Sequence, residues 1–378
     1  MQLNRLDLIN ILYTFMVSVL AILLPLYLID QNLDLGQIGI ILSLGPFIFL
    51  FFRVIFASIA DTIGTRKISL FYSLMSFFSV LTYSFSTTPF LFGLGTILEG
   101  FRAAGFWSII RTQTISESHL HQSPNLLIHY ANLRQIVDGL GRFIGGLIIV
   151  FIGFSNTFTF LMLLSFVILA LNFQNNHHQR KSELSPVPFY KKIIEKRSKS
   201  FWFSSFLQIL VWIPFNVVSY FLLPIYLKTN LNYSIEQTGF FVALFLSLIG
   251  VVSIVAQKIK VGLRSLFALS FLIAIGFFLF IVTSSPILPI LVLAIGMGAS
   301  NILAEYLLSK SITHSKEVST DIGLMFVPLK LVEFLVYLCS GFVISSFGYS
   351  PIFILCSISI LAFLFFSKKH FLNSNESF

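Results

Sequence analysis

Charged residues are scarce in this chain of 378 residues. Asp, Glu, Lys and Arg together make up only 10% of it, whereas 56% of the residues are hydrophobic and Phe alone occurs 45 times. An ordinary soluble domain carries about 25% charged residues, because it must present a polar surface to water. The scarcity of charge excludes a soluble enzyme, a disordered protein and a coiled coil. It indicates a chain whose solvent is lipid.

Cysteine is almost absent as well. The two cysteines, Cys339 and Cys356, both lie in apolar runs, which argues against a disulfide framework and against a zinc site. We therefore expect no metal and no cofactor. The phosphate-binding pattern Gly-x-x-x-x-Gly-Lys-(Ser/Thr) is also missing from the sequence. Its absence argues against ATP-driven work by this chain alone.

Long apolar runs fill most of the chain. A bilayer core about 30 Å thick is crossed by a helix of about 20 apolar residues. The first run is too long for a signal peptide and is expected to be a retained helix. Prolines, glycines, asparagines and charge clusters divide the chain into twelve predicted membrane-spanning helices: 8–29, 37–58, 68–87, 90–111, 126–151, 154–173, 201–227, 236–257, 264–283, 287–309, 322–346 and 350–367.

The basic residues sort to one side of these predicted helices. If the N-terminus is cytoplasmic, 18 of the 24 Lys and Arg residues fall in inside segments, and only Lys228 falls outside. Cytoplasmic segments of membrane proteins carry such an excess of Lys and Arg. We therefore predict a multi-pass protein of the cell membrane with both termini in the cytoplasm. The net charge of +9 is then a signal of topology and requires no nucleic-acid partner.

The two parts of the sequence resemble each other. Residues 23–28 read LLPLYL and residues 222–227 read LLPIYL, while GLIIVFIGFS at 146–155 aligns with GFVISSFGYS at 341–350. The alternative is chance similarity between apolar helices. The two matches are separated by nearly equal numbers of residues, 199 and 195, which argues against chance. We predict two pseudo-symmetric six-helix bundles, residues 1–173 and 201–378, joined by a basic cytoplasmic linker at 174–200.

The turn between the second and third predicted helices carries a short motif. Residues 57–67 read ASIADTIGTRK, and this resembles the loop signature of the major facilitator superfamily, Gly-x-x-Ala-Asp-Arg-x-Gly-Arg-(Arg/Lys). The matching positions are Ala60, Asp61, Gly64 and Arg66. The resemblance implies an all-α transporter of twelve helices in two bundles, and it assigns Asp61, Gly64 and Arg66 to a loop that latches one bundle against the other.

The chain departs from the family pattern in two places. Thr62 and Thr65 stand where the loop signature has Arg, which puts the strength of the latch in doubt. Family members also carry an Arg on the fourth helix, and Thr96 occupies that position here. The proton-linked duties of that family Arg therefore do not carry over to this chain.

A few charges remain inside the predicted helices. A charge at mid-bilayer costs at least about 2.5–3.5 kcal/mol, so it is normally paired or faces a cavity. Spacings of three or four residues place an acid and a base on the same helix face. The charged residues form three acid–base pairs at these spacings: Glu99 with Arg102, Asp138 with Arg142, and Lys330 with Glu333.

Two interpretations of these charges stay open. They are structural ion pairs that satisfy each other, or they line a water-filled path in which bases bind solute and acids change protonation. The resemblance implies that the first, fourth, seventh and tenth helices wall the cavity, which adds three residues to the candidates. The predicted substrate-path or coupling residues are Glu99, Arg102, Asp138, Arg142, Asn216, Asn301, Glu305, Lys330 and Glu333.

The sequence thus predicts a secondary active transporter of a small polar or charged solute. Its two bundles would rock about a site near the middle of the membrane, with protons as a candidate coupling ion. We expect a monomer without enzymatic activity, whose partners are a small-molecule substrate and the lipid bilayer. The alternatives are a multidrug-type efflux transporter, a non-transporting sensor or partner subunit of the same fold, and a membrane-embedded enzyme.

Overall fold

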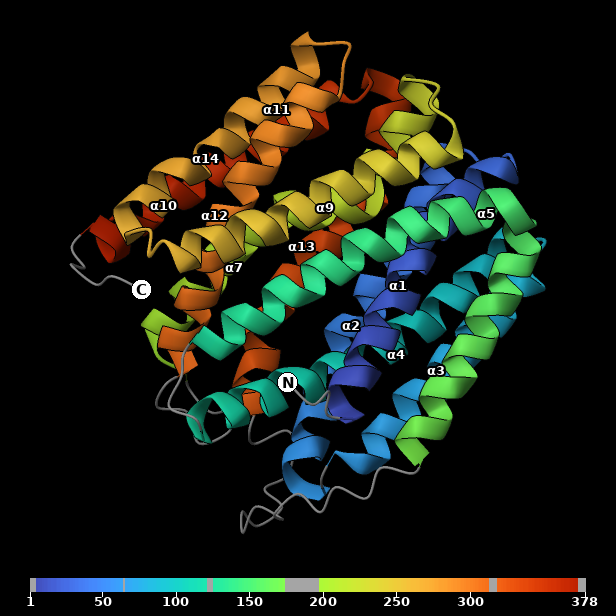
Figure 1. Cartoon of the computed structure of the whole chain (residues 1–378), viewed down its shortest axis with the longest axis horizontal. Coiled ribbons are helices and arrows are strands. Elements are labelled where there is room, and N and C mark those ends of the chain that lie inside the picture. The colour runs from blue at the N-terminus through green and yellow to red at the C-terminus, as the bar shows by residue number, and fades with distance from the viewer. Residues whose placement is uncertain (1–4, 64, 121–124, 174–196, 313–317, 373–378) are drawn as a thin grey trace.

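The computed structural model describes residues 5–63, 65–120, 125–173, 197–312 and 318–372. These residues form long helices and no strand. Figure 1 shows the helices packed side by side as a bundle. The first part of the chain contains α1 (Arg5–Asp30), α2 (Leu35–Ile63), α3 (Arg66–Ser84), α4 (Pro89–Leu120) and α5 (Asn125–Phe173).

The second part of the chain repeats this pattern of long helices with short turns. It contains α7 (Lys199–Val217), η1 (Val218–Leu222), α8 (Leu223–Ile225), η2 (Tyr226–Asn230), α9 (Ile235–Lys258), α10 (Leu263–Ser270), α11 (Leu272–Val282), α12 (Ile287–Ile312), α13 (Val318–Phe347) and α14 (Ser350–Leu372). The predicted linker, residues 174–200, lies outside the described residues as far as residue 196.

The helices fall where the apolar runs predict them. Nine helices of the described chain are long and apolar enough to cross a membrane, with the two arms of α5 counted as one. α3, which contains five serines, and α4, which contains Glu99 and Arg102, are not among the nine. With these two and the second arm of α5, the described chain has the twelve predicted segments. The prediction of an all-α polytopic membrane fold is confirmed.

Gly153 divides α5 into the two predicted helices. Its backbone has φ 79° and ψ 171°, a conformation that is essentially open to glycine alone. Figure 1 shows the chain turning back on itself within α5. Gly348 has φ 75° at the turn between α13 and α14, 195 residues further on. The predicted break between 151 and 154 is therefore confirmed, and it recurs in the second part of the chain.

The turns that precede α2 and α9 also match. Asn32 and Asn232 both have positive φ, 59° and 55°. The Gln37 amide donates to the Asp34 carboxylate at 2.8 Å, and the Gln237 amide donates to the Ser234 hydroxyl at 3.3 Å. In both turns the Gln side chain accepts a hydrogen bond from the capping residue's own amide, which completes a capping box. Such a recurrence is what a duplicated chain requires.

Two predicted helices are less regular than expected. The predicted span 264–283 is present as one membrane-crossing stretch, Leu263–Val282, but a single residue, Phe271, interrupts it between α10 and α11. The predicted helix 201–227 runs on to Asn230 and contains two π-helical turns, η1 and η2. Pro224 lies between them. A proline removes one helical hydrogen bond and crowds the preceding turn, and the wider π turns accommodate it.

Glycines bring the two parts of the chain together. α2 packs along α13, and α5 packs along α9; Figure 1 shows α5 and α9 running side by side. A Cβ atom at Gly39 would lie 2.7 Å from the Tyr337 carbonyl oxygen, and one at Gly146 would lie 3.2 Å from the Gly239 Cα. In lipid, small residues let helix backbones approach closely, since packing drives their association.

We predict that Gly341→Ala destabilises the protein by about 1–3 kcal/mol, the usual cost of overpacking. A Cβ atom at Gly341 would collide with the Leu35 backbone carbonyl, which cannot move aside as a side chain can. The measurement is thermal unfolding of the purified protein in detergent.

Gly323→Ala is the matched control on the same helix, because its Cβ atom would lie 3.6 Å from Val54, an ordinary van der Waals contact. The control is expected to stay within about 0.5 kcal/mol of the parent. Equal losses in both variants would show that close α2–α13 packing does not limit stability.

Candidate functional site

A cavity of about 310 Å³ lies between helices of both parts of the chain. Its walls come from α1, α2, α4 and α5 on one side and from α7, η1, α12 and α13 on the other. Most of the lining is apolar, but seven charged side chains reach it. They are Arg53, Glu99, Arg102, Arg134, Asp138, Lys330 and Glu333.

Most of the predicted site residues meet at this cavity. Seven of the nine line it: Glu99, Arg102, Asp138, Asn216, Asn301, Lys330 and Glu333. Arg142 and Glu305 are not among the lining residues, and both are buried in the protein. Of the predicted latch loop, Arg66 is exposed at the start of α3, whereas Gly64 and the side chain of Asp61 lie outside the described residues.

The first ion pair joins Glu99 and Arg102 on α4. The Arg102 Nη2 atom lies 2.8 Å from the Glu99 Oε1 atom, and its Nη1 atom donates to the Tyr13 hydroxyl of α1. The Tyr83 hydroxyl of α3 lies 3.3 Å from the second carboxylate oxygen of Glu99. Tyr83 also bonds at 2.9 Å to Thr96, which stands at the position of the family Arg. The pair therefore ties α1, α3 and α4 into one network.

The second ion pair lies on α5 and contacts η1. The Arg142 Nε atom lies 3.1 Å from the Asp138 carboxylate, and its Nη1 atom donates to the backbone carbonyl of Ser219. In the π-helical register of η1 that carbonyl would accept from residue 224. Residue 224 is Pro224, which has no amide hydrogen. Arg142 supplies the missing donor, and its guanidinium lies 4.6 Å from the centre of the Tyr220 ring.

The third ion pair lies on α13. The Lys330 Nζ atom is 2.5 Å from the Glu333 Oε2 atom, which also accepts from the Asn216 side chain of α7 at 3.1 Å. The Tyr337 hydroxyl donates to the Asn216 backbone carbonyl at 3.0 Å. Lys330 lies 4.9 Å from the centre of the Phe49 ring on α2. This pair therefore contacts a helix from the first part of the chain.

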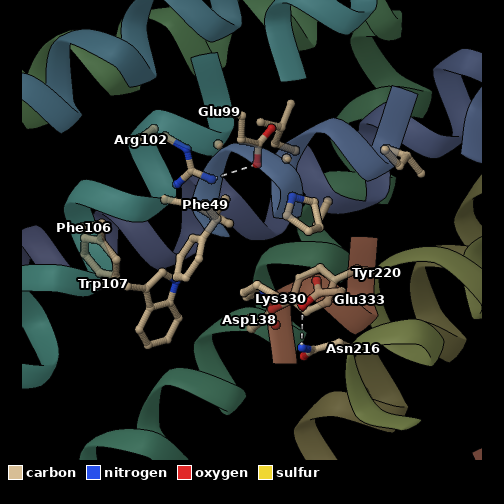
Figure 2. Close-up of a pocket in the computed structure, with 18 of the residues that line it drawn as sticks. Phe49, Glu99, Arg102, Phe106, Trp107, Asp138, Asn216, Tyr220, Lys330 and Glu333 are labelled. Atoms are coloured by element: carbon tan, nitrogen blue, oxygen red, sulfur yellow. Dashed lines mark hydrogen bonds and ion pairs between the residues drawn. The ribbon is translucent and has the colours of Figure 1, made fainter. Parts of the chain in front are cut away.

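The pairs face one another across the cavity. Figure 2 shows Glu99 and Arg102 on one side and Asp138, Asn216, Lys330 and Glu333 on the other. The sequence left two interpretations open, structural ion pairs or charges that line a path. The geometry has features of both, because the charges are paired and every one of them except Arg142 lines the cavity. Among the described residues, no group of three or more His, Cys, Asp and Glu side chains could hold a metal ion.

Three tyrosines are parts of the site that sequence reasoning missed. Tyr13, Tyr220 and Tyr337 line the cavity and contact a predicted site residue. Spacing along the chain could not find them, because each contacts a partner on another helix. The available signal is chemical: a tyrosine buried in an apolar helix needs a partner for its hydroxyl.

A comparison with known families agrees with this architecture. The sequence profile of the Major Facilitator Superfamily matches residues 6–320. The chain belongs to this superfamily. Its members are membrane transporters that bind small-molecule substrates, so the predictions of the family and of a membrane transporter are confirmed. A search of curated proteins finds no match to the chain.

We predict that Arg142→Gln lowers the stability of the transporter by about 3–5 kcal/mol, because it leaves the buried Asp138 carboxylate without its cation. The double variant Asp138→Asn/Arg142→Gln removes both charges and should recover a large part of the loss. The measurement is unfolding of the four proteins of this double-mutant cycle in detergent.

Lys258→Gln, at the exposed end of α9, is the control for loss of a basic residue and should stay within about 0.5 kcal/mol of the parent. If the losses of the two single variants simply add in the double variant, the pair is not coupled and our account of it is wrong.

Proposed function

We propose that the protein is a secondary active transporter of a small polar or charged solute, and that the cavity is its substrate site. The observation that supports this most is that paired charged side chains from α4, α5 and α13, namely Glu99, Arg102, Asp138, Lys330 and Glu333, line one cavity between the two parts of the chain. A charge in a membrane is expensive unless it is paired or faces a water-filled path. The five side chains are paired, and they face the cavity.

Transport requires the two six-helix bundles, residues 1–173 and 201–378, to rock about this site so that it opens to one side at a time. The contacts between the bundles suit such a motion. They include close helix packing at glycines, the Arg142 bond to the Ser219 carbonyl and the Lys330 contact with Phe49. The loop with Asp61, Gly64 and Arg66 is proposed as the cytoplasmic latch. In this proposal the protein lies in the cell membrane, and both of its termini lie in the cytoplasm.

Protons are the proposed coupling ion, and Glu99 is the proposed carrier. Of the three paired carboxylates its side chain is the most exposed, at 22%, against 11% for Asp138 and 6% for Glu333. Protonation of Glu99 would remove the charge that holds the Arg102 guanidinium. Arg102 would then present its positive charge to the cavity. Solute binding and proton binding would thereby favour each other, which is the requirement for coupling.

We predict that Glu99→Gln abolishes proton movement while solute exchange continues. Purified protein in lipid vesicles with a pH-sensitive dye inside should show solute-dependent proton flux, screened over anionic, neutral and cationic solutes. In the variant this flux should disappear, whereas counterflow of the same labelled solute persists, because exchange does not require the proton to leave.

Glu236→Gln is the matched control, since Glu236 lies in the first turn of α9 and does not line the cavity. Unchanged proton flux in Glu99→Gln would disprove the assignment of Glu99. A complete lack of counterflow with every solute class would disprove the proposed transport function and favour a non-transporting protein.

A further inference from the structure

The cavity has the size and walls of a site for a small amphiphilic molecule. Its volume of about 310 Å³ lies at the lower end of the range of small-molecule pockets, about 300–1,000 Å³. Small-molecule sites are mostly apolar, with a few polar groups that orient the ligand. Aromatic side chains form much of this lining: Phe49, Phe106, Trp107, Trp212, Phe215 and Tyr220.

The acidic groups of the cavity are already occupied. Glu99 accepts from Arg102 and Tyr83, and Glu333 accepts from Lys330 and Asn216. Asp138 accepts two bonds from Arg142, at 3.1 Å and 3.4 Å. A cationic ligand would therefore have to displace a bonded base from every carboxylate that it approached.

The basic groups exceed the acidic ones. Four basic side chains line the cavity, Arg53, Arg102, Arg134 and Lys330, against the three carboxylates. Arg142 adds a further positive charge directly behind Asp138. The Arg134 guanidinium lies 4.2 Å from the centre of the Trp107 ring, so that a charge and an aromatic surface are presented together. A site with excess positive charge and aromatic walls favours an anion with an apolar body.

Arg102 has donor capacity left for such an anion. Its side chain is buried, with 3% of the residue exposed, and it lines the cavity. Its Nε atom has no hydrogen-bond partner among the described residues. A buried donor without a partner costs about 1–3 kcal/mol. An oxygen atom of a bound acid would satisfy it.

We propose that the cavity binds a small organic anion with an apolar body, and that Arg102 receives its acidic group. This inference rests on the proposed function of the same cavity. Since basic side chains outnumber the acids of the lining, a negatively charged group is the complement. The aromatic walls receive the apolar body, and the guanidinium fork suits a carboxylate geometrically.

Tryptophan fluorescence of the purified full-length protein tests this directly, because Trp107 and Trp212 line the cavity and the chain has only three Trp residues. The probes are benzoate and cyclohexanecarboxylate, each compared with its amide of nearly equal shape, and benzylamine as the cation. We expect a saturable signal with both carboxylates and an affinity at least ten times lower for the amides and the amine.

The double variant Glu99→Gln/Arg102→Gln keeps the net charge of the lining and should weaken carboxylate binding at least tenfold. Its matched control is Asp321→Asn/Arg197→Gln, because that 2.8 Å ion pair lies outside the cavity lining. The control should bind as the parent does. If the first double variant does not fold, Arg102→Lys replaces it. This variant keeps the positive charge but loses the two parallel donors of the guanidinium. It should weaken carboxylate binding and leave any amide binding unchanged.

Equal binding of carboxylates and amides, stronger binding of benzylamine, or full binding by the Glu99→Gln/Arg102→Gln variant would overturn the inference. Counterflow in vesicles separates this failure from failure of the proposed function. If the protein exchanges a neutral or cationic solute but does not bind carboxylates, only the anion inference is disproved. If it binds carboxylates through Arg102 but exchanges no solute, only the transport proposal is disproved.

Discussion

A charged side chain inside a bilayer has no water to solvate it, and the structure depends on how this requirement is met. Each acid that lines the cavity is bonded to a base three or four residues away on its own helix. Each base then reaches beyond its helix: Arg102 to Tyr13, Arg142 to the Ser219 carbonyl, and Lys330 to Phe49. Pairing the charges therefore also positions the helices around the cavity. In the proposed function the same side chains also recognise the solute.

Close helix packing supplies the second constraint. Gly36 and Gly39 on α2 meet α13, and Gly146 on α5 meets Gly239 on α9. These contacts depend on packing, because lipid offers little hydrophobic drive between helices. Contacts of this kind suit two bundles that must separate and meet again, as the proposed alternating access requires.

Local features were predictable from the sequence because they depend only on spacing. Apolar runs of about 20 residues predict the helices, Gly153 predicts the break in α5, and offsets of three and four predict the three ion pairs. Contacts between helices were not predictable, since they depend on how each helix is rotated and where it crosses its neighbour. The Asn216 bond to Glu333 spans 117 residues, and the Arg142 bond to Ser219 requires a π turn that no spacing rule reveals. For the same reason Arg142 and Glu305, both predicted to line the path, do not line the cavity.

Access to the cavity from both sides of the membrane is the most direct test of the central claim. Ala103 lines the cavity on α4 and is half-buried, so Ala103→Cys would report access in a protein whose Cys339 and Cys356 are replaced by Ala. A thiol reagent that cannot cross the membrane would be applied to one face of oriented vesicles at a time. The account predicts that the introduced cysteine reacts from either face, because the cavity opens to each in turn. Reaction from one face only, or from neither, would contradict it.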